Sequence, residues 1–452
     1  MYFQSLNRRR GIGANSYLID LDDVRLVFDA GMDPKTEGLE SMPNYELAEY
    51  DSVDGIIVSH CHLDHIGSLP VLMRRQPRAR VYMTEGCGEL SDALLHNSVN
   101  VMTMKREELQ ITDYPFFTHR EVDQVEHVWD YVPVEKTFRI GKASEPECRF
   151  SDAGHIMGSV GTTIEHKGKR IFYTGDVNFE DQTLSIAASF PRDPVDVLIM
   201  ETTRGGVQRD PEYTRAREIE RVAEAICSTL DRDGSVMIPI FAMGKTQEML
   251  MMLHLLREAS VIPSTPIFIG GLSTKMTLIY DRFANQGVRN HKAFEILKEM
   301  KLSVASRRRK RDITYNPHCI YALSSGMMTE KTVSNKFAFE FIDNPKNSLL
   351  FVGYADPDSP AGKIRAAKKG DPILLDQNLA PVELHCEVHE FDFSGHAIRE
   401  DLRKFANDVT PKKIILVHGD DNAFEWFQQK LAEDMPDTEI VIAEPAEKIS
   451  LD

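Results

Sequence analysis

Four side chains that can bind a metal ion lie within six consecutive positions, residues 60–65, which read His-Cys-His-Leu-Asp-His. This segment follows the apolar residues 55–58, so we expect it at the end of a β-strand and in the turn after it. Its first two histidines point to one side of an extended chain, whereas the aspartate and the last histidine lie past the turn. Imidazole and carboxylate ligands without thiolate favour zinc, with manganese or iron as alternatives. The segment therefore predicts a metal-dependent enzyme with two neighbouring cations.

Further candidate residues stand where other short apolar segments end. Asp29 follows residues 25–28, His155 follows 149–154, Asp176 follows 169–175, Glu201 follows 195–200 and His418 follows 413–417. Layered α/β proteins gather their chemistry at strand ends, so we expect these side chains to meet. The grouping predicts His60, His62 and His155 for one cation, and Asp64, His65 and His418 for the other. Asp176 is expected to bridge the two cations, and Asp29 to orient a ligand imidazole or the loop.

The chemistry that this grouping favours is hydrolysis at phosphorus. Two cations about 3.5 to 4 Å apart hold a bridging hydroxide, lower its pKa and stabilise the oxyanion that forms on attack. The departing oxygen then needs a proton from a general acid. His396, in the segment 393–397, is the best candidate, and a carboxylate such as Glu201 would fix its tautomer and raise its pKa.

The elements that position these residues alternate between strands and helices, which predicts the α/β class. Helical periodicity covers residues 213–231 and 245–257. Strand-like segments at 235–240, 266–269, 320–323 and 349–352 indicate a separate parallel sheet inserted into the first domain. We therefore predict a first domain at 1–205 and 389–452, and an inserted domain at 206–388. Residues 2–5 look like the remnant of a cleavable tag and are left out of this prediction.

Composition excludes several classes of protein. The chain has 452 residues, 42% of them hydrophobic, and a net charge of −17, which disfavours nonspecific binding of nucleic acid. Its basic run at 307–311 is either a strip that contacts a polyanion or a solvated loop. The six scattered cysteines form no CxxC pair, which argues against a disulfide framework and favours the cytoplasm. No apolar run approaches the 18 or so residues of a membrane span.

The set of ligand residues resembles that of the metallo-β-lactamase superfamily. Glu201, His396 and His418 are similar to motifs A, B and C of its β-CASP branch, which comprises nucleases related to the pre-mRNA 3′-end-processing endonuclease subunit and ribonuclease J. The resemblance implies an αββα sandwich with an inserted β-CASP α/β cap, two zinc ions (or manganese) and a substrate strand in the cleft between them. It makes His396 and Glu201 the protonating pair and His418 a metal ligand. It also implies a two-domain, single-chain enzyme.

The inserted region carries further landmarks of that branch. They are residues 238–242, the Ser324-Ser325-Gly326 turn with Met327, and Gly353-Tyr354. The resemblance makes Ser324, Ser325 and Gly326 a phosphate contact, because small residues let backbone N–H groups approach a phosphate. Without the resemblance this segment would simply be a turn. Arg204 and Ile398 depart from residues that relatives commonly carry, so the resemblance leaves the substrate preference open.

These residues together predict a zinc-dependent ribonuclease. It would cleave single-stranded RNA as an endonuclease, with 5′ exonuclease activity as an additional mode, and His60, His62, Asp64, His65, His155, Asp176 and His418 would bind metal. Asp29, Asp64, Glu201 and His396 complete the catalytic set. One alternative is a metallo-hydrolase that acts on DNA or on a small ester, lactone or thioester; another is a noncatalytic scaffold for RNA processing. A homodimer is left open.

Overall fold

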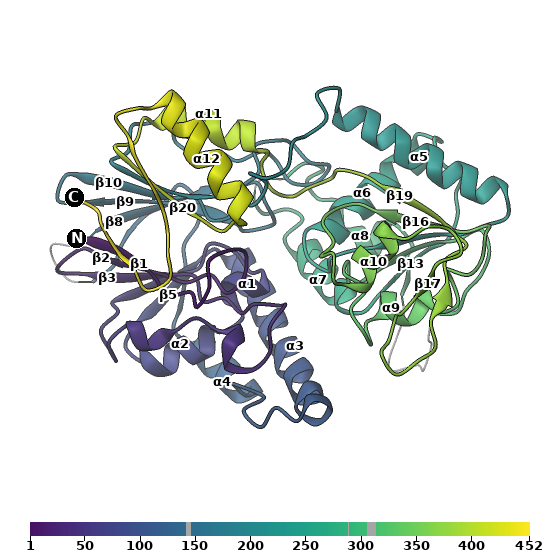
Figure 1. The fold of residues 1–452 in the computed structure, drawn as a ribbon, viewed down its shortest axis with the longest axis horizontal. Coiled ribbons are helices and arrows are strands. Elements are labelled where there is room, and N and C mark those ends of the chain that lie inside the picture. Colours follow the sequence, from purple (N-terminus) through teal and green to yellow (C-terminus); the bar gives the residue numbers. More distant parts are fainter. Residues whose placement is uncertain (142–145, 288, 305–312) are drawn as a thin grey trace. The chain divides into compact units, whose positions relative to one another are not determined.

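The structure is a computed structural model that describes residues 1–141, 146–287, 289–304 and 313–452 (Figure 1). The chain forms two compact units. The first contains residues 1–181, 186–209 and 396–452, and the second contains 182–185 and 210–395. The basic run at 307–311 lies outside the described residues. Within the described ranges, no helix has the length and apolarity needed to cross a membrane.

Two seven-stranded sheets form the centre of the first unit. The first has the order β22-β1-β2-β3-β4-β5-β6, with β22 at Lys448–Ser450, β1 at Tyr2–Ser5, β2 at Tyr17–Asp20, β3 at Arg25–Phe28, β4 at Gly55–Ile57, β5 at Arg80–Met83 and β6 at Trp129–Tyr131. The second has the order β21-β20-β11-β10-β9-β8-β7, with β21 at Glu439–Ile442, β20 at Lys413–Val417, β11 at Val197–Glu201, β10 at Lys169–Tyr173, β9 at Val160–His166, β8 at Glu147–Asp152 and β7 at Thr137–Arg139.

Strand β11 shows how the sequence divides the core of this unit. Val197 and Ile199 belong to the buried cluster that joins the two sheets, whereas Leu198 and Met200 pack against helices on the outer face. Successive side chains of a strand point to opposite faces, so an uninterrupted apolar strand is one that is covered on both sides. The outer helices are α11 at Arg399–Val409 and α12 at Asp421–Asp434, which supply Leu402, Phe405, Phe424 and Phe427.

Four helices accompany the first sheet. They are α1 at Leu63–Ile66, α2 at Leu69–Arg75, α3 at Glu85–Leu109 and α4 at His119–Glu126, with two short 3-10 helices at Gly38–Ser41 and Tyr45–Leu47. The side chain of Thr118 accepts a hydrogen bond from Glu121 in a capping box that starts α4. In Figure 1 these helices lie on one side of the paired sheets, and α11 and α12 lie on the other. The layer order is αββα, which confirms the fold class.

The N-terminal strand β1 was missed from the sequence. Tyr2–Ser5 pairs with both β2 and β22 and is therefore an inner strand of the first sheet. Phe3 is fully buried and stacks on Tyr17 at a centroid distance of 5.5 Å. Leaving this segment out of the fold prediction was wrong. One of its partners, β22, lies at the other end of the chain, and a local pattern carries no information about such a pairing.

The second unit is built on a parallel sheet of six strands, in the order β14-β13-β15-β12-β16-β19. The strands are β12 at Val236–Pro239, β13 at Ile267–Gly270, β14 at Ser303–Val304, β15 at Ile320–Leu323, β16 at Ser348–Phe351 and β19 at Glu387–Glu390. The helices are α5 at Arg215–Asp231, α6 at Lys245–Glu258, α7 at Leu272–Arg282, α8 at Ile296–Glu299, α9 at Val333–Ala338 and α10 at Pro360–Ala366. A small hairpin joins β17 at Pro372–Ile373 to β18 at Val382–Glu383.

The limits of this unit differ slightly from the predicted 206–388. Strand β19 pairs with β16, so the sheet extends past residue 388, and the unit runs from 210 to 395. Residues 182–185 also belong to it. The backbone N–H groups of Leu184 and Ser185 both donate hydrogen bonds to the Glu248 carboxylate of α6, at 2.8 and 2.6 Å. Four residues are too few to show a periodic pattern, so their place in the second unit could not be predicted from the sequence.

Candidate metal centre

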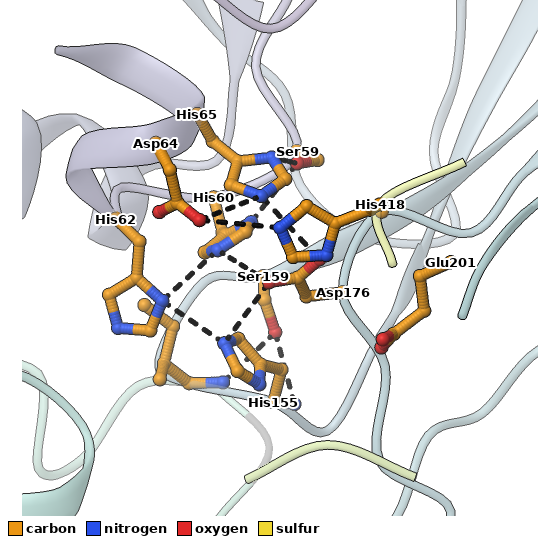
Figure 2. A network of polar contacts seen from close by, with 12 residues as sticks. Ser59, His60, His62, Asp64, His65, His155, Ser159, Asp176, Glu201 and His418 are labelled. Carbon is orange, nitrogen blue, oxygen red and sulfur yellow. Dashed lines mark hydrogen bonds and ion pairs between the residues drawn. The ribbon is translucent and has the colours of Figure 1, made fainter. Parts of the chain in front are cut away.

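The strand ends of the first unit bring the candidate residues to one place. Figure 2 shows the predicted metal ligands together with Glu201. Asp29 follows β3, His60 and His62 follow β4, Asp64 and His65 lie in α1, His155 follows β8, Asp176 follows β10, Glu201 ends β11, His396 precedes α11 and His418 follows β20. Strands β3 and β4 are parallel neighbours, and so are β10, β11 and β20. Parallel neighbours end at the same edge of a sheet, so residues that follow them are adjacent although they are far apart in sequence.

The first donor set consists of His60, His62, His155 and one oxygen of Asp176. Nδ1 of His62 lies 3.2 Å from Nε2 of His60 and 3.1 Å from Nε2 of His155. Oδ2 of Asp176 lies 3.4 Å from Nε2 of His60 and 3.8 Å from Nε2 of His155. Donors at about 2.1 Å from a tetrahedral zinc ion are separated by about 3.4 Å. The four atoms therefore have the spacing of ligands around one small cation.

The second donor set faces the other oxygen of Asp176. Oδ2 of Asp64 lies 3.3 Å from Nε2 of His418 and 3.8 Å from Nε2 of His65. Oδ1 of Asp176 is buried and lies 3.2 Å from Nδ1 of His418 and 3.5 Å from Nε2 of His65, but it forms no hydrogen bond of good geometry with either ring. Burying a carboxylate charge is costly unless a cation or good hydrogen bonds offset its desolvation. The two oxygens of Asp176 thus face two separate donor sets.

Burial and neighbouring charges shift the pKa values of the ligand imidazoles in opposite directions in the two donor sets. Burial and the neighbouring imidazoles hold the pKa of His60 well below its usual value, and burial lowers the pKa of His62 to about 4. Both rings are therefore neutral at pH 7, the form that binds metal. Burial lowers the pKa of His65, but the Asp176, Asp29 and Asp64 carboxylates outweigh burial and raise it to about 10. The same carboxylates would attract a divalent cation at the second donor set, and His65 would release its proton when the cation binds.

Side chains behind the donor sets orient the rings. The buried carboxylate of Asp29 accepts hydrogen bonds from the backbone N–H of Ser59 at 2.7 Å, from the Ser59 hydroxyl at 2.8 Å and from the Tyr173 hydroxyl at 2.6 Å. It also lies 2.8 Å from Nδ1 of His65, which turns Nε2 of that ring toward the second donor set. On the opposite side, the Thr203 hydroxyl lies 2.9 Å from Nδ1 of His418.

Three of these orienting residues were missed from the sequence. Ser59 directly precedes His60, Tyr173 lies three positions before Asp176, and Thr203 lies two positions after Glu201. Nearness to a predicted ligand was the available signal, but it does not say which neighbouring side chains point toward the site.

The backbone of two site residues is left-handed. Asp29 and His418 have φ of 61° and 52°, a conformation that is uncommon outside glycine and clusters at functional sites.

His396 lies at the rim of the metal centre and pairs with Glu201. Its Nδ1 lies 3.3 Å from Oε2 of Glu201 and 3.9 Å from Oδ2 of Asp176. The side chain of Glu201 is 1% exposed and that of His396 is 23% exposed, so the imidazole still reaches solvent. Burial lowers the pKa of His396, but the Glu201 and Asp176 carboxylates outweigh burial and raise it above its ordinary value. The ring can therefore hold a proton close to both donor sets.

The predicted phosphate contact lies in the second unit, directly after β15. The Ser324 hydroxyl donates to the backbone oxygen of Gly270 at 3.1 Å, and the Ser325 hydroxyl accepts from the backbone N–H of Thr329 at 3.3 Å. Both hydroxyls thus have partners within the chain. The role of Ser324, Ser325 and Gly326 toward a substrate stays a prediction.

Three family models match the chain. Residues 9–216 match a model described as the metallo-beta-lactamase superfamily, residues 246–364 match the Beta-Casp domain, and residues 381–443 match a model described as the Zn-dependent metallo-hydrolase RNA specificity domain. Together they cover most of the sequence. The chain belongs to the β-CASP branch of the metallo-β-lactamase superfamily. Membership in this superfamily implies a divalent metal, in agreement with the donor sets.

Several curated relatives match over nearly the whole chain. The transcription termination factor FttA of Methanothermobacter thermautotrophicus is 28% identical over 436 residues, 91% of this chain and 66% of that protein. The endoribonuclease YSH1 of Yarrowia lipolytica is 26% identical over 453 residues, 95% of this chain and 51% of that protein. Subunit 3 of the cleavage and polyadenylation specificity factor of Dictyostelium discoideum is 26% identical, with 98% and 56% covered. The chain thus spans about half to two thirds of these relatives.

One solved structure shares the fold over almost its full length. It is a protein of unknown function from Enterococcus faecalis V583, with a TM-score of 0.59, 13% sequence identity and 99% of each chain covered. At this identity the likeness concerns the fold alone.

Proposed function

We propose that this chain is a zinc-dependent endoribonuclease that hydrolyses phosphodiester bonds of single-stranded RNA. The observation that carries the proposal is the position of Asp176. Its two oxygens face two donor sets, and its Oδ2 lies 3.9 Å from Nδ1 of His396. Two cations beside a proton donor suit the displacement of an oxygen leaving group from phosphorus. The match to an RNA specificity domain and the relatives named as endoribonucleases favour RNA as the substrate.

In this proposal His60, His62 and His155 would hold one zinc ion, and Asp64, His65 and His418 would hold the other. Asp176, whose oxygens face both sets, would be shared between them. Zinc ions bound there would polarise the phosphate and supply an activated water molecule. Asp29 keeps the His65 ring in place, and Thr203 does the same for His418. Manganese, which accepts the same nitrogen and oxygen donors, is an alternative metal.

His396 acts as the general acid. Because Glu201 holds Nδ1, the proton for the departing oxygen is delivered from Nε2. Glu201 is itself fixed by the backbone N–H groups of Val177 at 2.7 Å and Thr203 at 3.3 Å, so the pair is held in one orientation. Protonation of the 3′ oxygen leaves a 3′-hydroxyl on one product and a 5′-phosphate on the other.

A comparison of substrates tests the proposal against other hydrolases of this fold. Purified chain loaded with zinc is expected to cleave labelled single-stranded RNA faster than DNA of the same sequence, and to leave simple esters, lactones and thioesters intact. Rapid turnover of a small ester or lactone with intact RNA would overturn the proposal. Metal analysis of the same preparation distinguishes the enzyme from a noncatalytic scaffold. About two zinc ions per chain are expected for the enzyme and none for a scaffold.

The chemistry of the cysteines agrees with a cytoplasmic enzyme. None of the six cysteines, all of which lie in the described ranges, forms a disulfide. Five of them, Cys61, Cys148, Cys227, Cys319 and Cys386, have a thiol pKa raised by burial, so their thiols are protonated and poorly reactive. A reducing compartment suits such a protein, and we place the enzyme in the cytoplasm.

A further inference from the structure

A shallow pocket lies at the carboxyl ends of three neighbouring strands of the second unit. Strands β15, β12 and β16 are adjacent and parallel, and their following loops contribute Gly326, Phe241 and Tyr354 to the lining. Ligands of parallel α/β sheets bind beyond the carboxyl ends of the strands. The pocket is therefore placed where this type of sheet receives a ligand, and its lining residues all belong to the second unit.

The lining exposes two aromatic rings. Phe241 is 38% exposed and Tyr354 is 59% exposed. Among the described residues of the second unit, they are the phenylalanine and tyrosine side chains with the largest exposed fractions, and both line this pocket. Aromatic rings with an open face are the surfaces on which single-stranded nucleic acids stack their bases. Two such rings at one pocket indicate a flat, unsaturated occupant.

Two glycines shape the surface around these rings. A Cβ atom on Gly326 would lie 3.1 Å from the Phe241 ring, so the absence of a side chain lets the ring lie against this segment. A Cβ atom on Gly353, the neighbour of Tyr354, would meet nothing within 4 Å. Space thus remains open beside Tyr354, and a larger side chain at 353 would fill it without a clash in the protein.

The charge at the edge of the pocket suits a polynucleotide. Lys245 is part of the lining and is the first residue of α6, a helix of 14 residues. The N-terminal end of a helix carries a partial positive charge that adds to that of the lysine. The Lys245 ammonium group donates to the backbone oxygen of Phe393, which fixes its position. In a chain of net charge −17, this local positive charge favours a backbone phosphate next to a stacked base.

We propose that an unpaired base of the RNA substrate stacks on the exposed ring of Tyr354 at the mouth of this pocket, beside Phe241. The inference rests on the proposed function, because the occupant is the RNA strand itself. Every base has a π-face, so the contact tolerates any base sequence. It selects single strands over duplexes, since a paired base is stacked within its own helix.

The test measures KM for a single-stranded RNA with the zinc-loaded chain. Tyr354→Ala is expected to raise KM by about 5- to 150-fold, the range of one base–aromatic stack. Tyr354→Phe keeps the ring and is expected to match the wild type. Gly353→Val places a side chain in the open space and is expected to raise KM as well. Zinc content and melting temperature do not depend on base stacking, so they should be unchanged in all three variants and serve as the control for folding.

A scan with abasic nucleotides separates a stacking contact from a structural role. In the wild type, removing the base at one position of the RNA should raise KM to the value of Tyr354→Ala, whereas in that variant the same change should have no further effect. Equal KM values for the wild type and Tyr354→Ala, or an unchanged abasic effect in the variant, would overturn the stacking proposal while RNA cleavage stands. A wild-type chain that cleaves no RNA would overturn the proposed function, and the stacking proposal with it.

Discussion

Asp176→Asn is expected to remove RNA cleavage almost entirely, by about 10³-fold or more, which corresponds to about 4 kcal/mol of transition-state stabilisation. Each oxygen of Asp176 faces one donor set, and the side chain is 2% exposed. The amide removes one negative charge and replaces one acceptor oxygen with an N–H donor, so one of the two sets loses its bridging ligand. Metal analysis should show less zinc per chain, and labelled RNA should remain intact at wild-type enzyme concentrations.

The stability of this variant separates lost function from lost folding. Burial raises the pKa of Asp176, so its charge destabilises the metal-free protein. In EDTA, Asp176→Asn should therefore melt at or above the temperature of the wild type, whereas added zinc should stabilise the wild type more. Asp408→Asn, on the exposed side of α11 where its carboxylate pairs with Arg192, is the matched control and should keep zinc and activity. Full activity in Asp176→Asn would contradict a bridging role.

His396→Ala is expected to reduce RNA cleavage by about 10²- to 10⁴-fold while the variant retains its zinc. The imidazole is not part of either donor set, but it lies beside both and is held by Glu201. A general acid matters only when the leaving oxygen needs a proton. Hydrolysis of bis-p-nitrophenyl phosphate releases p-nitrophenolate, a stable anion, so this reaction should be nearly unaffected. His127→Ala, an exposed histidine of the same unit, is the control.

The pH dependence of the Glu201→Gln variant tests the assignment of His396 as the general acid. The Glu201 carboxylate raises the pKa of His396, and activity is lost as pH rises through that pKa because the acid loses its proton. Glutamine removes the charge, so the decline of kcat at high pH should begin at a lower pH. Equal losses on RNA and on the activated ester in His396→Ala, with an unshifted profile in Glu201→Gln, would mean that this pair positions the substrate and does not protonate it.

The sequence predicted which metal-binding residues lie at the strand ends, because each of these residues directly follows a short apolar segment. Asp176 follows β10 and His418 follows β20, two strands separated in the sheet only by β11. Parallel strands place such residues together whatever their distance along the chain. The grouping of His60, His62 and His155 against Asp64, His65 and His418 was available from this rule together with the residue types.

Other features of the fold depend on contacts between distant parts of the chain, which local sequence patterns do not predict. Strand β1 is defined by pairing with β22, and residues 182–185 join the second unit through hydrogen bonds to Glu248. The roles of Ser59 and Tyr173 follow from the direction in which their hydroxyls point, toward the buried Asp29. Sequence spacing predicts which residues are near a site, whereas the packing of the sheets decides which of them turn toward it.

The ends of the RNA products test the central claim most directly. A defined single-stranded RNA of known sequence should be cut at internal positions, leaving a 5′-phosphate on the downstream fragment and a 3′-hydroxyl on the upstream fragment. Cleavage should persist when the nucleotide before the cut lacks its 2′-hydroxyl, because the attacking oxygen comes from water. Fragments with 2′,3′-cyclic phosphate and 5′-hydroxyl ends, or protection by the 2′-deoxy substitution, would contradict hydrolysis at this metal centre. Mononucleotides released only from the 5′ end would contradict the endonuclease mode.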